Sequence, residues 1–354
     1  MSGVYYADYL KLDKLLSAQV PLARKNEATV HEETLFIITH QVYELWFKQI
    51  LHELDSVRSL FSESGLRDQD ISKVVARLHR VVEIQRLSVD QIKVLETMTP
   101  MEFLEFRDAL VPASGFQSVQ FRLIENKLGL KRRTEYGGAA YSSRLKPEHQ
   151  ALVSASETEP NLISLVDDWL ARTPFLKSEE FAFWKEYRKA VEGILSREEA
   201  EIRQLPPASQ SSQMKRLEST RANFAALFDR TAHEKLVAEG KRRFSFEAMK
   251  AALLILLYRD EPVFQMPFRM LHNLADIDEW MSTWRVRHSE MVFRMIGNKM
   301  GTGGSSGHDY LRKTAEDHRI FFDIGNLSTF LISQSDLPEL PEAFARSLGF
   351  HYQG

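Results

Sequence analysis

The apolar residues of this chain recur at helical spacing over most of its length. In the clearest stretch the steps between such positions alternate between four and three residues, which keeps them on one face of a long helix. These positions are Phe36, His40, Tyr43, Phe47, Ile50, Leu54, Val57 and Phe61. Stretches in which apolar and polar residues alternate, as in a half-buried strand, are nearly absent. The pattern therefore predicts an all-α fold, with His40 on a buried stripe.

Capping signals predict where several helices begin and end. Residues 99–102 combine a Thr-x-x-Glu capping box with proline at the first helical position, and this helix is expected to stop near Pro112. The acidic residues at 276–279 indicate the start of a later helix that ends at Gly297. The remaining helices are expected at 71–95, 116–128, 162–171, 178–203, 214–239 and 246–259.

Composition along the chain predicts a single domain over residues 1–354. Residues 131–157 are rich in Arg, Gly and Ser and show little apolar periodicity, which predicts a surface loop or insertion. The strongly charged helices of residues 160–240 are expected to form an appended helical segment. Within it, Pro206-Pro207 and a Ser/Gln run are predicted to separate two antiparallel helices.

Charge and cysteine content narrow the class of protein. The 46 basic and 49 acidic residues give a net charge of −3, which offers no electrostatic reason to expect a nucleic acid or an anionic membrane as partner. The absence of cysteine excludes disulfides and thiolate-bound metals, so His, Asp and Glu are the available metal ligands. The longest apolar run, 251–258, is too short to cross a bilayer, and a cytoplasmic location is expected.

Two histidines, His40 and His288, fall on predicted helices in apolar surroundings. A single histidine of this kind is more often a hydrogen-bonded core residue than a ligand. A non-haem metal centre is disfavoured, because no histidine follows a glutamate by three residues and no His-Glu-x-x-His motif occurs. A haem needs one protein ligand and an apolar slot, which Met281, Trp284 and Met291 near His288 would suit. An ordinary methionine-rich core has the same spacing, so both interpretations stay open.

Arg107 shares a helix face with Phe103 and Leu110, where a guanidinium is costly unless it is paired. Its partner is either a protein carboxylate or the carboxylate of a ligand held by two charge-assisted hydrogen bonds.

The segment 301–307 is rich in glycine and suggests a nucleotide-binding loop. It lacks the lysine of a P-loop, Ser306 stands at the third glycine of a dinucleotide fingerprint, and a helix precedes it, so that interpretation fails. Either a plain flexible loop or a loop that closes over a ligand, with Thr302 supplying a hydroxyl, fits the sequence.

Taken together, these segments resemble the tryptophan 2,3-dioxygenase family over nearly the whole chain. The resemblance rests on several long motifs in the family's order. They are Leu35-Phe36-Ile37-Ile38-Thr39-His40-Gln41, Tyr43-Glu44-Leu45-Trp46-Phe47-Lys48, Leu95-Glu96-Thr97-Met98-Thr99, Phe106-Arg107, Pro112-Ala113-Ser114-Gly115-Phe116-Gln117-Ser118, Trp284-Arg285 with His288, and the segment 299–307.

The resemblance implies a haem-dependent dioxygenase that cleaves the indole C2–C3 bond of L-tryptophan with O2. The product is N-formyl-L-kynurenine, in the first step of the kynurenine pathway of tryptophan catabolism. His288 would be the axial ligand of haem b iron, active as Fe2+, and His40 would accept a hydrogen bond from the indole N–H. The other substrate-binding residues that the resemblance implies are Phe36, Ile37, Ile38, Thr39, Phe103, Arg107 at the carboxylate, Thr302 at the ammonium, Leu110, Ser114 and Gly115.

The resemblance also implies a homotetramer, built as a dimer of dimers, in which residues 1–30 form an arm toward the neighbouring subunit. Tyr6 and Tyr9 of this arm would reach the neighbour's active site, and Ala7 stands where the family usually has glycine. Two rivals remain: a related haem enzyme that inserts one oxygen atom into a substituted indole, and a haem sensor without turnover.

Overall fold

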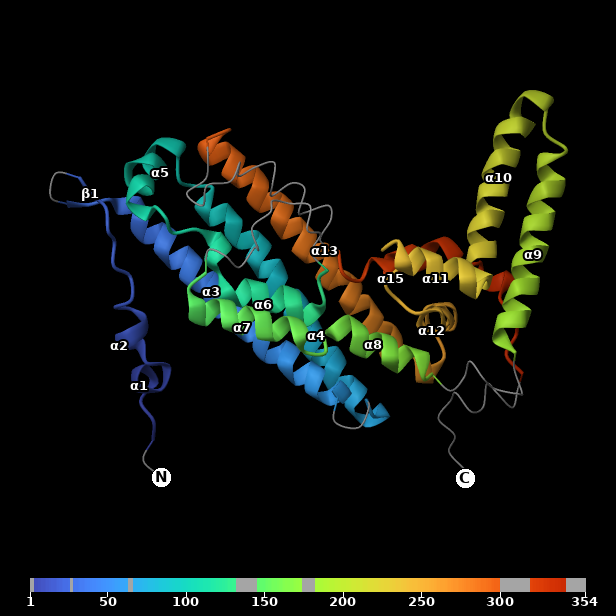
Figure 1. Ribbon diagram of the computed structural model, residues 1–354, viewed down its shortest axis with the longest axis horizontal. Helices are drawn as coiled ribbons and strands as arrows, with labels where there is room; N and C mark the ends of the chain where they lie inside the picture. Colours follow the sequence, from blue (N-terminus) through green and yellow to red (C-terminus); the bar gives the residue numbers. More distant parts are fainter. Residues whose placement is uncertain are drawn as a thin grey trace. The chain divides into compact units, whose positions relative to one another are not determined.

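A computed structural model describes residues 3–25, 28–62, 66–131, 145–173, 182–299 and 319–341 of the chain. Within these residues the predicted all-α fold is confirmed (Figure 1). The only strands there are an antiparallel pair of two residues each, β1 (Arg24–Lys25) and β2 (Ala28–Thr29). No helix in this described part is long and apolar enough to span a membrane. The α-helices are α1 (Tyr6–Leu10), α2 (Leu12–Leu15), α3 (His31–Ser62), α4 (Asp68–Leu95), α5 (Pro100–Arg107), α6 (Val119–Leu128), α7 (Pro147–Thr158), α8 (Leu162–Ala171), α9 (Phe183–Ile202), α10 (Pro207–Phe228), α11 (Arg230–Ala238), α12 (Phe246–Leu257), α13 (Pro262–Ile296) and α15 (Phe322–Asn326).

The chain divides into two compact units, and α3, α4 and α13 contribute residues to both. The first unit comprises Met1–Asp55, Arg80–Glu159 and Glu279–Arg319, and the second comprises Ser56–His79, Pro160–Asp278 and Ile320–Gly354. The expectation of one catalytic domain over residues 1–354 stays a prediction.

The apolar stripe predicted on α3 is buried over most of its length. Every stripe member from Tyr43 to Phe61 is buried, whereas Phe36 and His40 near the start of the helix are half-buried. Burial of such a stripe against other helices is the main source of helix stability in a folded protein. The apolar stripe is therefore incompletely covered by other side chains at its N-terminal end, at Phe36 and His40.

The predicted capping box begins α5. The Thr99 hydroxyl accepts a hydrogen bond from the Glu102 N–H at 3.3 Å, and the Thr99 N–H donates to the Glu102 carboxylate at 2.7 Å. Proline occupies the first helical position, where its missing N–H costs no hydrogen bond. The helix is shorter than predicted, because it ends at Arg107 and a 3-10 turn, η1 (Asp108–Leu110), follows it.

The loop predicted for residues 131–157 is wrong over its second half, where α7 forms. Val153 of α7 is fully buried, and the Asn126 side-chain amide of α6 donates to the Val153 carbonyl at 3.2 Å and to the Ser156 hydroxyl at 2.8 Å. Helix α7 packs against α6, and this tertiary packing stabilises the helix although its sequence shows little apolar periodicity. Residues 132–144 lie outside the described residues.

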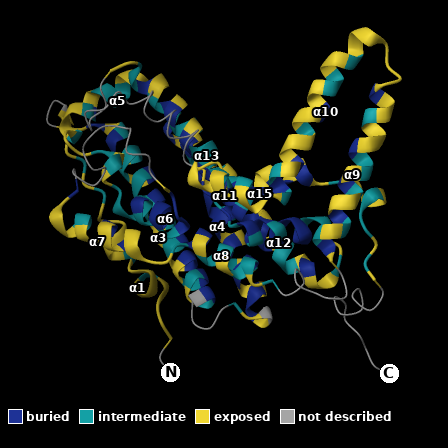
Figure 2. Ribbon diagram, turned by 45° about the vertical axis from the view of Figure 1, so that its right-hand side comes forward, coloured by how far each residue is buried: buried dark blue, intermediate teal, exposed yellow. Residues whose placement is uncertain are grey.

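Helices α9 and α10 form a pair that lies side by side (Figures 1 and 2). The separator predicted after Pro206 is too long, because Pro207 opens α10 and the Ser/Gln run is helical. The single helix predicted for 214–239 is interrupted at Asp229, whose carboxylate accepts from the Thr231 N–H at 2.8 Å and caps α11. Whether residues 160–240 are an appended segment stays a prediction.

The helix that carries His288 begins earlier than predicted. It starts at Pro262 and continues through Pro267, so the acidic residues at 276–279 are interior and do not cap it. One of them, Asp278, is buried and accepts hydrogen bonds from the Ile320 and Phe321 N–H groups at 2.6–2.9 Å.

Candidate functional site

A cluster of aromatic rings surrounds His40 in the first unit. The Phe36 ring lies 4.1 Å from the His40 imidazole, centroid to centroid, and 5.9 Å and 5.5 Å from Phe103 and Phe106 of α5. Phe103 and Phe106 meet edge to face at 5.3 Å. Phe106 is buried, whereas the other three rings are half-buried. The cluster therefore has a packed side and an accessible, largely apolar side.

The hydrogen bonding of His40 fixes the role of each ring nitrogen. Its Nδ1 lies 2.7 Å from the Phe36 carbonyl oxygen. A carbonyl only accepts, so Nδ1 carries the proton and donates it. Burial lowers the pKa of His40 from its ordinary value, although the Phe36 carbonyl and the charge of Glu44 oppose that shift. The neutral ring consequently keeps a lone pair on Nε2, which makes Nε2 a hydrogen-bond acceptor.

His288 of α13 is a second neutral imidazole. Burial lowers its pKa to about 4, and the charge of His40 acts in the same direction. Its Nδ1 is buried and has no hydrogen-bond partner among the described residues. The Trp284 ring, one turn earlier in α13, stacks on it at 5.0 Å with an interplanar angle of 3°. His288 is therefore held in the form that ligates a metal ion.

Aromatic residues from two other helices support the Trp284 ring. Phe121 of α6 packs against it at 5.3 Å, and Tyr43 of α3 presents an edge at 6.0 Å. The Tyr43 hydroxyl donates to the Ser88 carbonyl of α4 at 2.8 Å, which fixes the phenol ring. The plane of His288 is thus set by packing that extends into the core.

A buried ion cluster lies next in sequence to the stacked rings of Trp284 and His288 and joins α13 to α6. Glu125 accepts hydrogen bonds from Arg122 at 3.0 Å and from Arg285 at 2.8 Å, and all three residues are buried. The Arg285 guanidinium also lies 5.8 Å from the Phe121 ring centroid. Because Arg285 follows Trp284 in α13, the cluster ties that helix to α6 beside the His288 stack.

Replacing Glu125 with alanine should destabilise the protein by about 3–5 kcal/mol, because it leaves buried guanidinium groups without their carboxylate. Urea unfolding followed by circular dichroism measures this. The matched control is Glu83→Ala, which removes a surface partner of Arg86 and should cost less than about 1 kcal/mol. Equal losses in the two variants would show that the cluster contributes no more than a surface pair.

Comparison with known proteins identifies the family. The profile described as tryptophan 2,3-dioxygenase matches residues 1–331. The chain belongs to this family. It is 49% identical to the tryptophan 2,3-dioxygenase of Alteromonas mediterranea, over 99% of this chain and 98% of that protein. It is 48% identical to the tryptophan 2,3-dioxygenases of Bdellovibrio bacteriovorus (99% of both chains) and Xenopus laevis (96% of this chain, 84% of that protein).

Several residues to which the tryptophan 2,3-dioxygenase resemblance gives a role lie near the aromatic cluster in sequence. Arg107 ends α5 and is half-buried, as is Leu110 in η1. The Ser114 hydroxyl accepts from the Phe116 N–H at 3.4 Å at the start of the 3-10 turn η2 (Gly115–Gln117). A Cβ added at Gly115 would meet no atom of the described residues within 4 Å, so among those residues the space beside this turn is open.

The other residues to which the family resemblance gives a role differ widely in exposure. Tyr6 and Tyr9 of α1 are 70% and 74% exposed, so in the isolated chain they line no packed site. On α3, Ile37 is half-buried and Ile38 exposed, whereas Thr39 is buried and its carbonyl accepts from Gln91 at 2.8 Å. Thr302, the last of the predicted site residues, belongs to the segment 300–318 and lies outside the described residues.

The sequence did not predict the buried ion pair between Arg285 and Glu125. Arg285 was noted only as the neighbour of Trp284, and nothing in the spacing linked it to Glu125. The available signal was its place on the apolar face of a helix, which for a guanidinium implies a buried partner.

Proposed function

We propose that the chain is a haem-dependent dioxygenase that opens the indole ring of L-tryptophan with O2. The observation that carries this proposal is the pair of neutral histidines, His40 with an accepting Nε2 and His288 with an available lone pair, beside an accessible aromatic cluster. Family membership gives the substrate and the reaction.

The residues present fit a haem with one protein ligand. The His288 ring is neutral, and its buried Nδ1 has no hydrogen-bond partner among the described residues. Among the described residues, no group of three or more His, Asp or Glu side chains is placed to bind a metal ion. A haem iron needs only one protein ligand, and His288 is the residue that best fits this role there. Bound there, ferrous haem b would supply the iron chemistry that activates dioxygen.

The chain's own residues would bind and orient the substrate. Phe36 and Phe103 would hold the indole between flat apolar faces, while His40 Nε2 accepts the hydrogen bond of the indole N–H. Arg107 would clasp the carboxylate with two hydrogen bonds, and Thr302 would hold the ammonium group. Leu110, Ser114 and Gly115 would line the side on which oxygen enters.

This arrangement assigns catalysis largely to positioning. Two anchored ends of the amino acid leave the indole C2 and C3 atoms at a fixed place, which lowers the entropic part of the barrier. The C2–C3 bond breaks and both oxygen atoms enter the product, N-formyl-L-kynurenine. The apolar rings around the indole would exclude water from competing reactions.

The assembly proposed is a homotetramer in the cytoplasm. The exposed arm supports it, since Val4, Tyr5, Tyr6 and Tyr9 are each more than two thirds exposed in the isolated chain. Apolar and aromatic side chains on such an arm are typical of a segment that packs on another subunit.

The product formed in 18O2 tests the reaction. Haem-loaded protein with L-tryptophan should give a product heavier by two labelled oxygen atoms and an absorbance rise from formylkynurenine. A gain of one oxygen atom would favour the related single-oxygen enzyme, and unchanged tryptophan would favour a sensor.

Replacing His40 with alanine should weaken turnover without abolishing it. Loss of the Nε2 acceptor leaves the indole N–H to water, which should lower kcat/KM by about five- to a hundredfold. The control substrate is the tryptophan analogue whose ring nitrogen is replaced by sulfur. This analogue has no N–H to donate to His40, so wild type and His40→Ala should have similar kcat/KM values for it. Complete inactivity of the variant would instead indicate that His40 is an obligatory base.

A further inference from the structure

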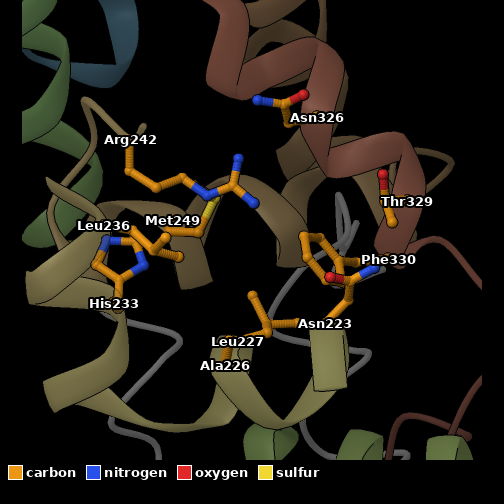
Figure 3. A pocket seen from close by; sticks show the side chains of 10 residues that line it. All are labelled: Asn223, Ala226, Leu227, His233, Leu236, Arg242, Met249, Asn326, Thr329 and Phe330. Carbon is orange, nitrogen blue, oxygen red and sulfur yellow. The ribbon is translucent and has the colours of Figure 1, made fainter. Parts of the chain in front are cut away.

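The second unit contains a cavity of about 150 Å3 whose lining residues are remote in sequence from His40, Phe103 and His288. Figure 3 shows side chains from α10, α11, α12 and the segment 326–330 arranged around it. Its walls are partly apolar, from Leu227, Met249 and Phe330, which are buried. A cavity of this size is smaller than a drug-sized pocket and suits a compact molecule.

One cation, Arg242, lines the cavity and is held from two sides. Its guanidinium lies 3.6 Å from the Asp323 carboxylate and 6.0 Å from the Phe330 ring centroid. The Asp323 carboxylate is itself fixed, because its other oxygen accepts from the Arg243 and Phe244 N–H groups at 2.5 Å and 2.7 Å. At 3.6 Å the ion pair is longer than a charge-assisted hydrogen bond, so it leaves the donors of the guanidinium fork available.

The hydrogen bonding around this ion pair is incomplete. The Asp323 oxygen that faces Arg242 is buried and has no hydrogen-bond partner among the described residues. Buried polar atoms without a partner are uncommon and often mark the place of a water molecule or a ligand. At the rim, Asn223, Asn326 and Thr329 add amide and hydroxyl groups (Figure 3).

The charges limit what this cavity can hold. Arg242 supplies the guanidinium of this lining and is already paired with Asp323, which disfavours a dianion such as a phosphate monoester. The guanidinium fork matches a single carboxylate, and the apolar wall matches a compact hydrocarbon body. We propose that this cavity binds a small organic monocarboxylate of about ten non-hydrogen atoms, with its carboxylate on Arg242 and its apolar body against Met249 and Phe330.

The probe for this proposal is 4-fluorobenzoate, observed by 19F NMR with the full-length, haem-loaded protein. Saturable broadening is expected below about 20 mM, since a ligand of this size gains only a few kcal/mol. Arg242→Gln should weaken binding by about ten- to a hundredfold, as expected for the loss of charge-assisted hydrogen bonds. The matched control is Lys241→Gln, which removes the same charge from an exposed neighbour paired with Glu239 and should bind the probe like wild type.

Two further variants keep the result interpretable. Ala226→Phe places a bulky ring in the cavity from α10 and keeps both charged side chains, so it should abolish binding even if Arg242→Gln fails to fold. Arg107→Leu should leave the signal unchanged, which separates this cavity from the proposed tryptophan site. The proposal is overturned if no saturable binding occurs, which would make the cavity a water site, or if Ala226→Phe binds the probe like wild type.

Discussion

His288→Ala is expected to give a folded protein that no longer holds haem. His288 is the neutral imidazole whose buried Nδ1 has no hydrogen-bond partner among the described residues, and its removal would leave the proposed iron site without a protein ligand. Changes to residues that only support a metal ligand weaken metal binding about 10- to 100-fold, so loss of the ligand itself should exceed that range. Titration with hemin, followed at the Soret band, measures the change.

The control for this experiment lies on the same helix. His272 is an exposed histidine of α13 that lies 3.8 Å from Asp276, and His272→Ala should retain haem. Far-UV circular dichroism verifies that both variants are folded. Added imidazole should partly restore the Soret band of His288→Ala, because the variant leaves a gap against Trp284 that the free ring fits. A fully loaded, active His288→Ala protein would refute the assignment.

Arg107→Leu is expected to raise the KM for L-tryptophan by at least about a hundredfold while haem content stays near that of wild type. The two charge-assisted hydrogen bonds proposed between Arg107 and the substrate carboxylate would be lost, each contributing about 1.5–3 kcal/mol. Steady-state kinetics and the Soret absorbance of the purified variant separate substrate binding from cofactor binding.

The conservative variant Arg107→Lys sharpens this test. Lysine keeps the positive charge but lacks the planar fork, so its KM should lie between those of wild type and Arg107→Leu. Tryptamine has no carboxylate for residue 107 to bind, so its KM should be similar for wild type, Arg107→Lys and Arg107→Leu. An unchanged KM for tryptophan in Arg107→Leu would mean that the guanidinium serves only the fold at the end of α5.

Periodicity predicted the helices well where one face is strongly apolar. The stripe from Tyr43 to Phe61 identifies α3, because burial of such a face is what stabilises the helix. It failed for α7, which has little apolar periodicity and is held by hydrogen bonds from Asn126. It also misplaced the start of α13, since prolines and acidic residues occur both at helix starts and inside helices.

The candidate site could be predicted only in part. Sequence selects His40 and His288 as unusual, but their proximity depends on how α3 and α13 pack, which no spacing reveals. The proton on His40 Nδ1 depends equally on three-dimensional structure, because it follows from one carbonyl 2.7 Å away. Family resemblance supplied the roles that periodicity cannot, and those roles stay predictions until the variants are measured.

The bond between His40 and the Phe36 carbonyl has a consequence for altering substrate range. Both residues belong to one turn of α3, their rings lie in tilted contact at 4.1 Å, and His40 donates to the Phe36 carbonyl, so a change at either residue disturbs both. Phe103 belongs to α5 and contacts Phe36 only through ring packing at 5.9 Å. Enlarging the proposed pocket for ring-substituted tryptophans should therefore begin at Phe103, where a substitution keeps the hydrogen bond between His40 and the Phe36 carbonyl.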